Sequence, residues 1–124
     1  MRHVVRAMKA LGDETRLRIL NLLLERECCV CEVMQVLDIS QTRASRNLAM
    51  LYDAGLLRLR REGAWAYYSI DWDEVETYAV ELLKAVKDAL EGNEVARNDR
   101  IRLEKAERLG PVCCRQEVAG TTHS

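Results

Sequence analysis

Five cysteines carry the most distinctive chemistry in this sequence. Cys28, Cys29 and Cys31 fall close together, and Cys113 and Cys114 form an adjacent pair near the C-terminus. Thiolate is a soft ligand, so this set favours soft, thiophilic ions over hard cations such as Mg²⁺. The sequence therefore predicts a site for a thiophilic metal or metalloid.

The spacing of the first three cysteines restricts how they can share one ion. On a regular helix Cys28 and Cys31 lie on one face, whereas Cys29 and Cys31 point in nearly opposite directions. All three thiols can meet on one small ion only if the first turn of that helix unwinds or never forms. Binding at such a site would therefore distort the element that contains it.

Apolar residues recur at helical spacing over most of the chain, and polar caps separate the periodic segments. This pattern predicts helices over residues 2–11, 15–26, 28–37 and 41–54. Asp13 and Ser40 are the expected N-caps of the second and fourth helices. Gly55 is expected to take the left-handed conformation just past the fourth helix.

The middle of the chain predicts a hairpin followed by a long helix. Residues 56–70 alternate apolar and polar side chains on both sides of a turn near Gly63. Asp71, with Glu74 three residues later, resembles a capping box and is expected to start the long helix, which a break near Gly92 interrupts. This order of elements predicts a mainly α chain with a β-hairpin wing, a winged helix-turn-helix.

The predicted domain organisation has three parts. Residues 1–92 are expected to form a winged helix-turn-helix domain for DNA binding and dimerisation, residues 93–109 a helical extension, and residues 110–124 a mobile tail with the cysteine pair. An apolar stripe along the last helix of the first part is too long for one small core to cover. Packed with the first helix against a second copy, it predicts a two-fold homodimer.

Positive charge gathers where the fold predicts contact with DNA. The whole chain has a formal net charge of −1, but residues 40–68 hold five arginines against two acidic residues. Donor-rich side chains of middling length suit base edges and phosphates. The candidate residues for binding double-stranded operator DNA are Gln41, Thr42, Arg43, Ser45, Arg46 and Asn47 on the fourth helix, and Arg58, Arg60 and Arg61 on the wing.

Composition excludes several other classes of protein. A chain of 124 residues with 48% hydrophobic and 31% charged residues suits one globular domain. It has neither an apolar run long enough for a membrane helix nor a secretory signal pattern, so we expect a cytoplasmic protein without membrane contact. Phosphate-loop and hydrolase motifs are absent, and His3 and His123 lie too near the termini to serve a cysteine nucleophile. We therefore expect no enzyme.

Three segments of the sequence resemble the ArsR/SmtB family of bacterial metal-responsive repressors. LGDETRLRIL resembles the family's junction between its first two helices, and SQTRASRNLAMLYDAGLL its recognition helix, with Asn47 where histidine is common. ECCVCEV resembles the cysteine box of the branch that senses arsenite, cadmium or lead, with Cys28 in place of a leucine. The resemblance implies a homodimeric repressor of an arsenic-resistance operon whose affinity for its operator falls on binding the inducer.

The resemblance also implies the ligands of the inducer. Trivalent arsenic, which prefers three sulfurs, is the expected inducer, with antimony(III), cadmium and lead as alternatives. Cys29 and Cys31 match the box, while Met34 stands where the family has a third cysteine. The third ligand is therefore either Cys28 or a tail cysteine, Cys113 or Cys114, of the same or the other subunit. A repressor of the same fold that is switched by thiol oxidation is a further alternative, and no permanent cofactor is expected.

Overall fold

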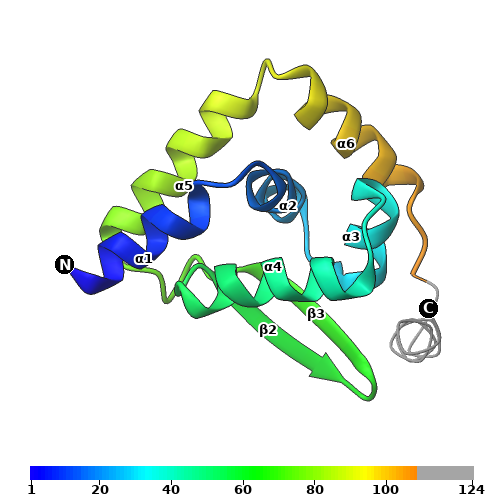
Figure 1. The fold of residues 1–124 in the computed structure, drawn as a ribbon, viewed down its shortest axis with the longest axis horizontal. Coiled ribbons are helices and arrows are strands. Elements are labelled where there is room, and N and C mark those ends of the chain that lie inside the picture. Colours follow the sequence, from blue (N-terminus) through cyan, green and yellow to red (C-terminus); the bar gives the residue numbers. More distant parts are fainter. Residues whose placement is uncertain (109–124) are drawn as a thin grey trace.

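The computed structural model describes residues 1–108 of the chain, which form helices and a three-stranded sheet (Figure 1). Cys113, Cys114 and His123 lie outside these residues. In chain order the elements are α1 (Arg2–Leu11), α2 (Glu14–Glu25), β1 (Cys28–Cys29), α3 (Val30–Leu37), α4 (Gln41–Asp53), β2 (Leu57–Glu62), β3 (Trp65–Ile70), α5 (Thr77–Leu90) and α6 (Glu94–Lys105). The predicted mainly α fold with a hairpin wing is confirmed.

The helix boundaries around the helix-turn-helix follow the predicted caps. The Asp13 carboxylate accepts the backbone N–H of Arg16 at 3.0 Å, and the Ser40 hydroxyl accepts that of Arg43 at 3.1 Å. Each bond satisfies a donor that the first turn leaves unpaired. Gly55, with φ of +82°, follows α4 in the left-handed region, as the sequence predicts.

Helix α3 begins later than the sequence predicts. Cys28 and Cys29 form strand β1, which pairs antiparallel with β3, and the first residue of α3 is Val30. The prediction that the helix starts at Cys28 is therefore wrong, because pairing with a strand distant in sequence holds both cysteines extended. If the three thiols are to share one ion, the first helical turn must either unwind or never form, as the sequence implies. In the structure no helical turn forms across Cys28 and Cys29.

Helix α5 also begins later than predicted. Its first residue is Thr77, and no side chain caps it. The Asp71 carboxylate instead accepts a hydrogen bond from Arg58 at 3.2 Å, and the Asp71 carbonyl closes a turn with the N–H groups of Glu74 and Val75. Asp71 is therefore not the cap of the long helix, because the wing arginine takes its carboxylate.

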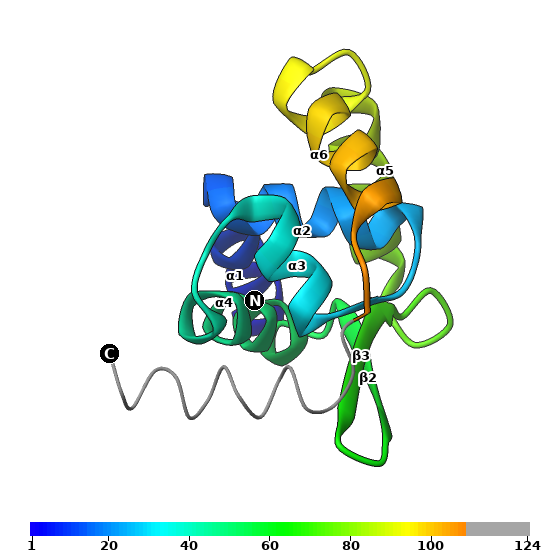
Figure 2. The same cartoon turned by 90° about the vertical axis from the view of Figure 1, so that its right-hand side faces the viewer.

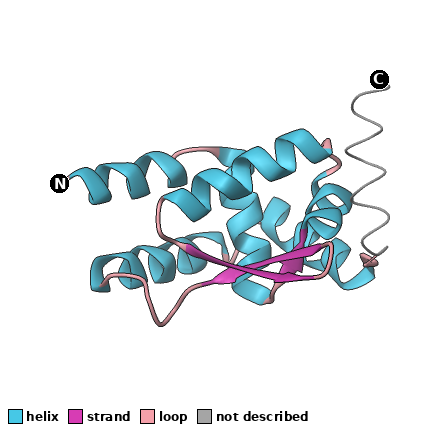
Figure 3. Cartoon of the chain, turned by 90° about the horizontal axis from the view of Figure 1, so that it is seen from below, coloured by secondary structure: helices cyan, strands magenta, loops and turns pink. Residues whose placement is uncertain are grey.

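The sheet has the order β1-β3-β2, and its hairpin projects from the helical body (Figure 2). Strands β2 and β3 pair from Leu57 with Ile70 to Glu62 with Trp65. The two residues between the strands begin with Gly63, whose φ of +63° supplies the left-handed turn conformation. Seen from below, the crossed strands lie under the helices (Figure 3).

The main hydrophobic core joins the helices. Helix α2 runs through its centre with Ile19, Leu20 and Leu22 fully buried, and α4 and α5 contribute other buried leucines, such as Leu48 and Leu83. No helix in the described part of the chain is long and apolar enough to span a membrane.

Helix α6 follows a break after α5 and packs back against α2 (Figure 1). Asn93 caps its first turn by accepting the N–H of Ala96 at 3.0 Å. Asp99, only 2% exposed, accepts two hydrogen bonds from the Arg18 guanidinium at 2.8 and 3.0 Å. This ion pair between Arg18 and Asp99 holds α6 against α2. Helix α6 lies within the helical extension predicted for residues 93–109.

Candidate thiol site and nucleic-acid interface

The alternation of side chains along β1 sends adjacent cysteines to opposite faces of the sheet. Cys28 pairs with Tyr68 and packs into the main core. Cys29 pairs with Tyr67 and packs, together with Cys31, in a separate cluster. The structure therefore brings Cys29 and Cys31 together and places Cys28 on the other side.

We call this separate group the thiol cluster; its members are Cys29, Cys31, Tyr67 and Trp65. Cys29 and Cys31 are at most 1% exposed. The Trp65 and Tyr67 rings stack with their centroids 5.5 Å apart and their planes 9° from parallel. The cluster thus lies between the start of α3 and the half of β3 that leads from the hairpin turn.

Cys29 is also the N-cap of α3. Its sulfur accepts the backbone N–H of Glu32, and the Glu32 carboxylate accepts the backbone N–H of Cys29 at 3.0 Å. This is a reciprocal capping box in which a thiol replaces the usual hydroxyl. The same sulfur atom that could bind a soft ion therefore also holds the first turn of α3.

Two arginines clamp the Glu32 carboxylate, which is only 2% exposed. Arg26 donates to it at 2.7 Å and Arg108 at 3.1 Å. Burial raises the pKa of Glu32, but the hydrogen bonds from Arg26 and from the Cys29 N–H outweigh it, so that the pKa is lowered. Glu32 is therefore a charged anchor at the point where β1, α3 and the end of the described chain meet.

The thiols of Cys28 and Cys29 are protonated at neutral pH. Burial raises the pKa of Cys28 to about 12. It raises that of Cys29 to about 11, although the Glu32 backbone N–H lowers it in part. A ligand that binds these groups as thiolates must therefore displace their protons.

Within residues 1–108, no three histidine, cysteine or acidic side chains are arranged to hold a metal ion. Of the five predicted thiol ligands, Cys29 and Cys31 share the thiol cluster, Cys28 lies in the main core, and Cys113 and Cys114 lie beyond the described residues. The thiol cluster by itself thus offers two sulfurs from these positions.

The predicted recognition helix, α4, presents some of its polar side chains outward and uses others internally. Thr42, Arg43 and Arg46 are exposed. Gln41 donates to the Ser45 hydroxyl at 3.0 Å, within the helix. The exposed three are therefore the best placed of this set to reach a nucleic acid.

The side chain of Asn47 is engaged inside the protein. It accepts a hydrogen bond from Arg16 at 3.2 Å and donates to the Arg43 carbonyl at 2.9 Å. Arg16, whose side chain is 13% exposed, also donates to the carbonyls of Lys9 and Ala10 at the end of α1. Arg16 and Asn47 thus join α1 to α4, a connection that the sequence analysis did not find.

The wing arginines differ in their partners. Arg58 pairs with Asp71 at 3.2 Å. Arg60 pairs with Glu27 at 2.7 Å, and its guanidinium lies 4.3 Å from the centre of the Tyr67 ring. Arg61 is exposed, and no ion pair involves it among residues 1–108. The wing therefore contacts the thiol cluster through Arg60 while leaving Arg61 available.

Known proteins resemble this chain in sequence and in fold. The family model described as bacterial regulatory protein, arsR family, matches residues 13–58. The arsenic resistance transcriptional regulator ArsR1 of Pseudomonas putida is 43% identical over 109 residues, which cover 86% of this chain and 83% of the relative. The chain belongs to the ArsR family. It is accordingly a DNA-binding transcriptional regulator and not an enzyme.

Two further comparisons support this assignment to the ArsR family. The arsenical resistance operon repressor of Escherichia coli is 46% identical over 67 residues, 53% of this chain and 57% of that protein. The homodimeric winged helix-turn-helix domain of Mb0332 from Mycobacterium bovis, a possible ArsR-family regulator, has a TM-score of 0.61 and 32% identity, covering 75% of this chain and 82% of its own. The winged helix-turn-helix fold predicted from the sequence is confirmed.

Sequence reasoning missed Glu32 and Arg108 as parts of this site. A glutamate three residues after Cys29 fits the spacing of a capping box and could have indicated Glu32. Arg108 gave no local signal, because it is 76 residues away from the carboxylate that it contacts.

Replacing Glu32 by glutamine should lower the free energy of unfolding by about 1–3 kcal/mol near neutral pH, because Arg26 and Arg108 lose their carboxylate. The Glu32 pKa is lowered in the fold, so its contribution is present above the unfolded value of 4.5 and is lost as pH falls through the folded value. Urea denaturation from neutral to acidic pH should therefore show the difference between wild type and variant shrinking.

The matched control is Glu25→Gln, since the Glu25 side chain is 51% exposed and its ion pair with Arg100 measures 3.8 Å. It should cost less than about 0.5 kcal/mol. A difference for Glu32→Gln that persists undiminished in acid would contradict the assigned role of the carboxylate.

Proposed function

We propose that this ArsR-family chain is a homodimeric repressor of an arsenic-resistance operon. It binds operator DNA through α4 and the wing, and it releases the operator when trivalent arsenic coordinates Cys29 and Cys31 together with a third thiol. Antimony(III) shares this chemistry. The observation that carries the proposal is that the sulfur of Cys29 is both the cap of α3 and a wall of the thiol cluster.

DNA binding is assigned to the exposed side chains of α4 and the wing. Arg43 and Arg46 point outward from α4, and arginine is suited to bidentate contact with guanine or phosphate. Arg61 on the wing can reach the neighbouring backbone. Gln41 and Ser45 are half-buried and hydrogen-bond each other, whereas Arg58 and Arg60 are exposed and pair with Asp71 and Glu27. Asn47 is half-buried and hydrogen-bonds Arg16.

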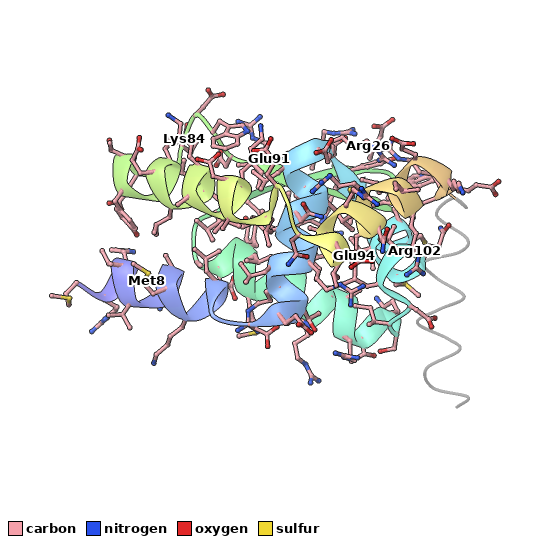
Figure 4. The ribbon with its side chains drawn as sticks, turned by 90° about the horizontal axis from the view of Figure 1, so that it is seen from above. Met8, Arg26, Lys84, Glu91, Glu94 and Arg102 are labelled. Carbon is pink, nitrogen blue, oxygen red and sulfur yellow. The ribbon has the colours of Figure 1, made fainter. Side chains whose placement is uncertain are left out.

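Dimer formation is assigned to α1 and α5, which both lie at the left of Figures 1 and 4. Val5 is 42% and Met8 51% exposed, and because they lie one turn apart on α1 they form an apolar patch that a second copy could cover. Leu82 on α5 is half-buried. A two-fold dimer through these helices presents two copies of α4 to successive major grooves.

Arsenic binding and operator binding are linked through α3. Coordination of the Cys29 sulfur takes away the acceptor of the Glu32 N–H and so removes the cap of an eight-residue helix. Loss of an N-cap costs about 0.5–2 kcal/mol. Helix α3 packs directly on α4, so the distortion reaches the recognition helix. A coupling of about 1–3 kcal/mol, which changes affinity by roughly 5- to 150-fold, is typical of such linkage.

Cys29→Ser should keep operator binding and lose the response to arsenite. Serine is a good N-cap, so α3 keeps its first turn, whereas a hydroxyl is a poor ligand for a soft ion. Fluorescence anisotropy of a labelled promoter fragment should show wild-type affinity for this variant and no release with arsenite. Normal release by arsenite would overturn the site, and Cys28→Ala, which changes the other face of β1, is the matched control that should still respond.

Arg46→Ala should weaken operator binding whether or not arsenite is present. The loss of one guanidinium that contacts a base edge costs about 1–3 kcal/mol, or roughly 5- to 150-fold in affinity. The control is Arg97→Ala, which removes an exposed arginine from α6. Equal operator affinities of the two variants, measured by the same anisotropy titration, would show that α4 is not the reading helix.

The pH dependence of binding should separate arsenite from a divalent cation such as cadmium or lead. Arsenite enters as As(OH)₃ and leaves its oxygens as water, so three protonated thiols give As(SR)₃ and three H₂O with no net proton release. Cd²⁺ must expel one proton per thiol, and the Cys29 pKa of about 11 keeps that thiol protonated.

The association constant for arsenite should therefore stay flat between about pH 6 and 8, while that for cadmium rises about tenfold per pH unit for each thiol bound. Isothermal titration in buffers of different ionisation enthalpy measures the protons released. If cadmium were the stronger inducer across this range, the arsenic assignment would fail and the cadmium alternative would replace it.

A further inference from the structure

Helix α1 carries three cations and no carboxylate. Arg2, Arg6 and Lys9 are exposed, and the first twelve residues of the chain contain no acidic side chain. Within the described part of the chain, none of the three cations forms an ion pair. The proposed dimer contact uses the apolar patch of α1 and leaves these charges without a role.

The three cations form one line along the helix, which we call the basic stripe. Arg6 and Lys9 follow Arg2 by four and seven residues, so the three side chains lie within about 60° of one another around the helix axis. The buried residues of α1 are Ala7 and Ala10. The basic stripe therefore runs along the exposed side of the helix, where a partner can reach it.

The stability of α1 does not account for the basic stripe. Arg2 is the first residue of the helix, and the first turn contains no acidic residue. The N-terminal end of a helix dipole is positive and favours anions, so a cation there makes the isolated helix less stable. The position of Arg2 instead suits an anionic partner outside the helix.

The basic stripe borders the exposed face of α4. A groove of about 510 Å³ separates the two helices, and the stripe lines it together with Met50 and Asp53 of α4. Met50 and Asp53 follow Arg46 by four and seven residues, so all three share one face of α4. The stripe therefore adjoins the face that carries Arg46, a side chain assigned to DNA binding.

Arg16 fixes the end of α1 beside this face of α4. It donates to the carbonyls of Lys9 and Ala10 at 3.1 and 2.7 Å. It also donates to the Asn47 side chain at 3.2 Å and contacts the Met50 sulfur at 3.4 Å. The cations of α1 are thus attached to the recognition helix through specific hydrogen bonds.

We propose that the basic stripe binds the phosphate backbone of the operator, between the two sites that the two copies of α4 read. This inference rests on the proposed function, which makes α4 the reading helix and α1 a dimer helix. Around α1 the stripe lies between the apolar patch of Val5 and Met8 and the groove shared with α4. A two-fold axis at that patch places both stripes over the minor groove between successive major grooves.

The dimensions of the stripe suit a DNA strand. From Arg2 to Lys9 the helix rises about 10 Å, at 1.5 Å per residue. A strand of B-DNA carries one phosphate for about every 3.4 Å of helix axis, so the stripe matches roughly three phosphates. Phosphate contacts carry no sequence information directly. The stripe is therefore expected to add affinity and fix the register, while α4 supplies the specificity.

The first test is the double variant Arg2→Gln/Arg6→Gln, which removes four cations from a dimer. Glutamine has a helix propensity close to that of arginine, so α1 should persist. At about 0.15 M salt the operator affinity should fall about tenfold or more, because four phosphate contacts are lost. The plot of log association constant against log salt concentration should become less steep by up to about 3.6, which is 0.9 for each contact. Fluorescence anisotropy of a labelled promoter fragment measures both.

The matched control is Arg97→Gln/Lys105→Gln. It removes the same charge from exposed positions of α6, which lies on the other side of α2 from α4 (Figures 1 and 2). Its salt dependence should stay close to that of wild type. Equal slopes for the two double variants would overturn the proposal. So would a changed dimer dissociation constant of Arg2→Gln/Arg6→Gln at an unchanged slope, since it would show that a second copy of the chain covers the stripe.

A second measurement separates this inference from the proposed function. Loss of a phosphate contact weakens all sequences alike, whereas loss of a base contact relaxes specificity. The ratio of affinities for the promoter fragment and a scrambled fragment should therefore stay within about twofold of wild type for Arg2→Gln/Arg6→Gln and should fall for Arg46→Ala. A fall for the stripe variant would overturn the phosphate assignment. An unchanged ratio for Arg46→Ala would instead overturn the reading role of α4.

The place of contact on the DNA is tested with uncharged methylphosphonate linkages. They replace phosphates either at the centre of the wild-type footprint or at its outer ends. Central replacement should weaken wild type about tenfold or more but Arg2→Gln/Arg6→Gln less than about threefold, because that variant has already lost the contacts. Replacement at the ends should weaken both proteins equally. Equal weakening of both by central replacement would overturn the proposal.

Discussion

The buried carboxylate of Glu32 is the interaction on which the rest of the site depends. It accepts hydrogen bonds from the backbone N–H of Cys29, at the start of α3, and from the guanidinium groups of Arg26 and Arg108. Arg26 follows the last residue of α2, and Arg108 is the last residue that the structure describes. A carboxylate this deeply buried stays charged only when its oxygens are paired, whereas the side chains of Arg26 and Arg108 are 38% and 39% exposed. Any movement of Cys29 therefore disturbs α3 and the segment after α6 together.

The pairing of β1 with β3 determines which cysteines can cooperate. Because strand residues alternate between faces, Cys28 enters the hydrophobic core while Cys29 faces Tyr67 and the wing. The thiol cluster thereby touches two elements of the DNA-binding unit, α3 through the capping box and β3 through Tyr67. A ligand on these sulfurs can act on the recognition helix and the wing at once.

The helix-turn-helix is also linked to the first helix. Arg16 binds the last carbonyls of α1 and the amide of Asn47 on α4, so the helix assigned to the dimer contact and the helix assigned to DNA are held by one guanidinium. Asn47 occupies a position that sequence reasoning assigned to the DNA surface. Its amide hydrogen-bonds Arg16 and the Arg43 carbonyl, which links α4 to the end of α1.

The sequence alone was enough to determine the elements that depend on local chemistry. The helices begin or end where the sequence predicts at Asp13, Ser40 and Gly55, because N-caps and left-handed glycines act on residues a few positions away. The soft-ligand character of the cysteines is likewise a property of their side chains. Tertiary structure alone decided that Cys28 is separated from Cys29, that Arg58 takes the carboxylate of Asp71, and that Arg108 reaches Glu32. These outcomes depend on strand pairing and ion pairs between residues far apart in the chain, and no local pattern encodes such contacts.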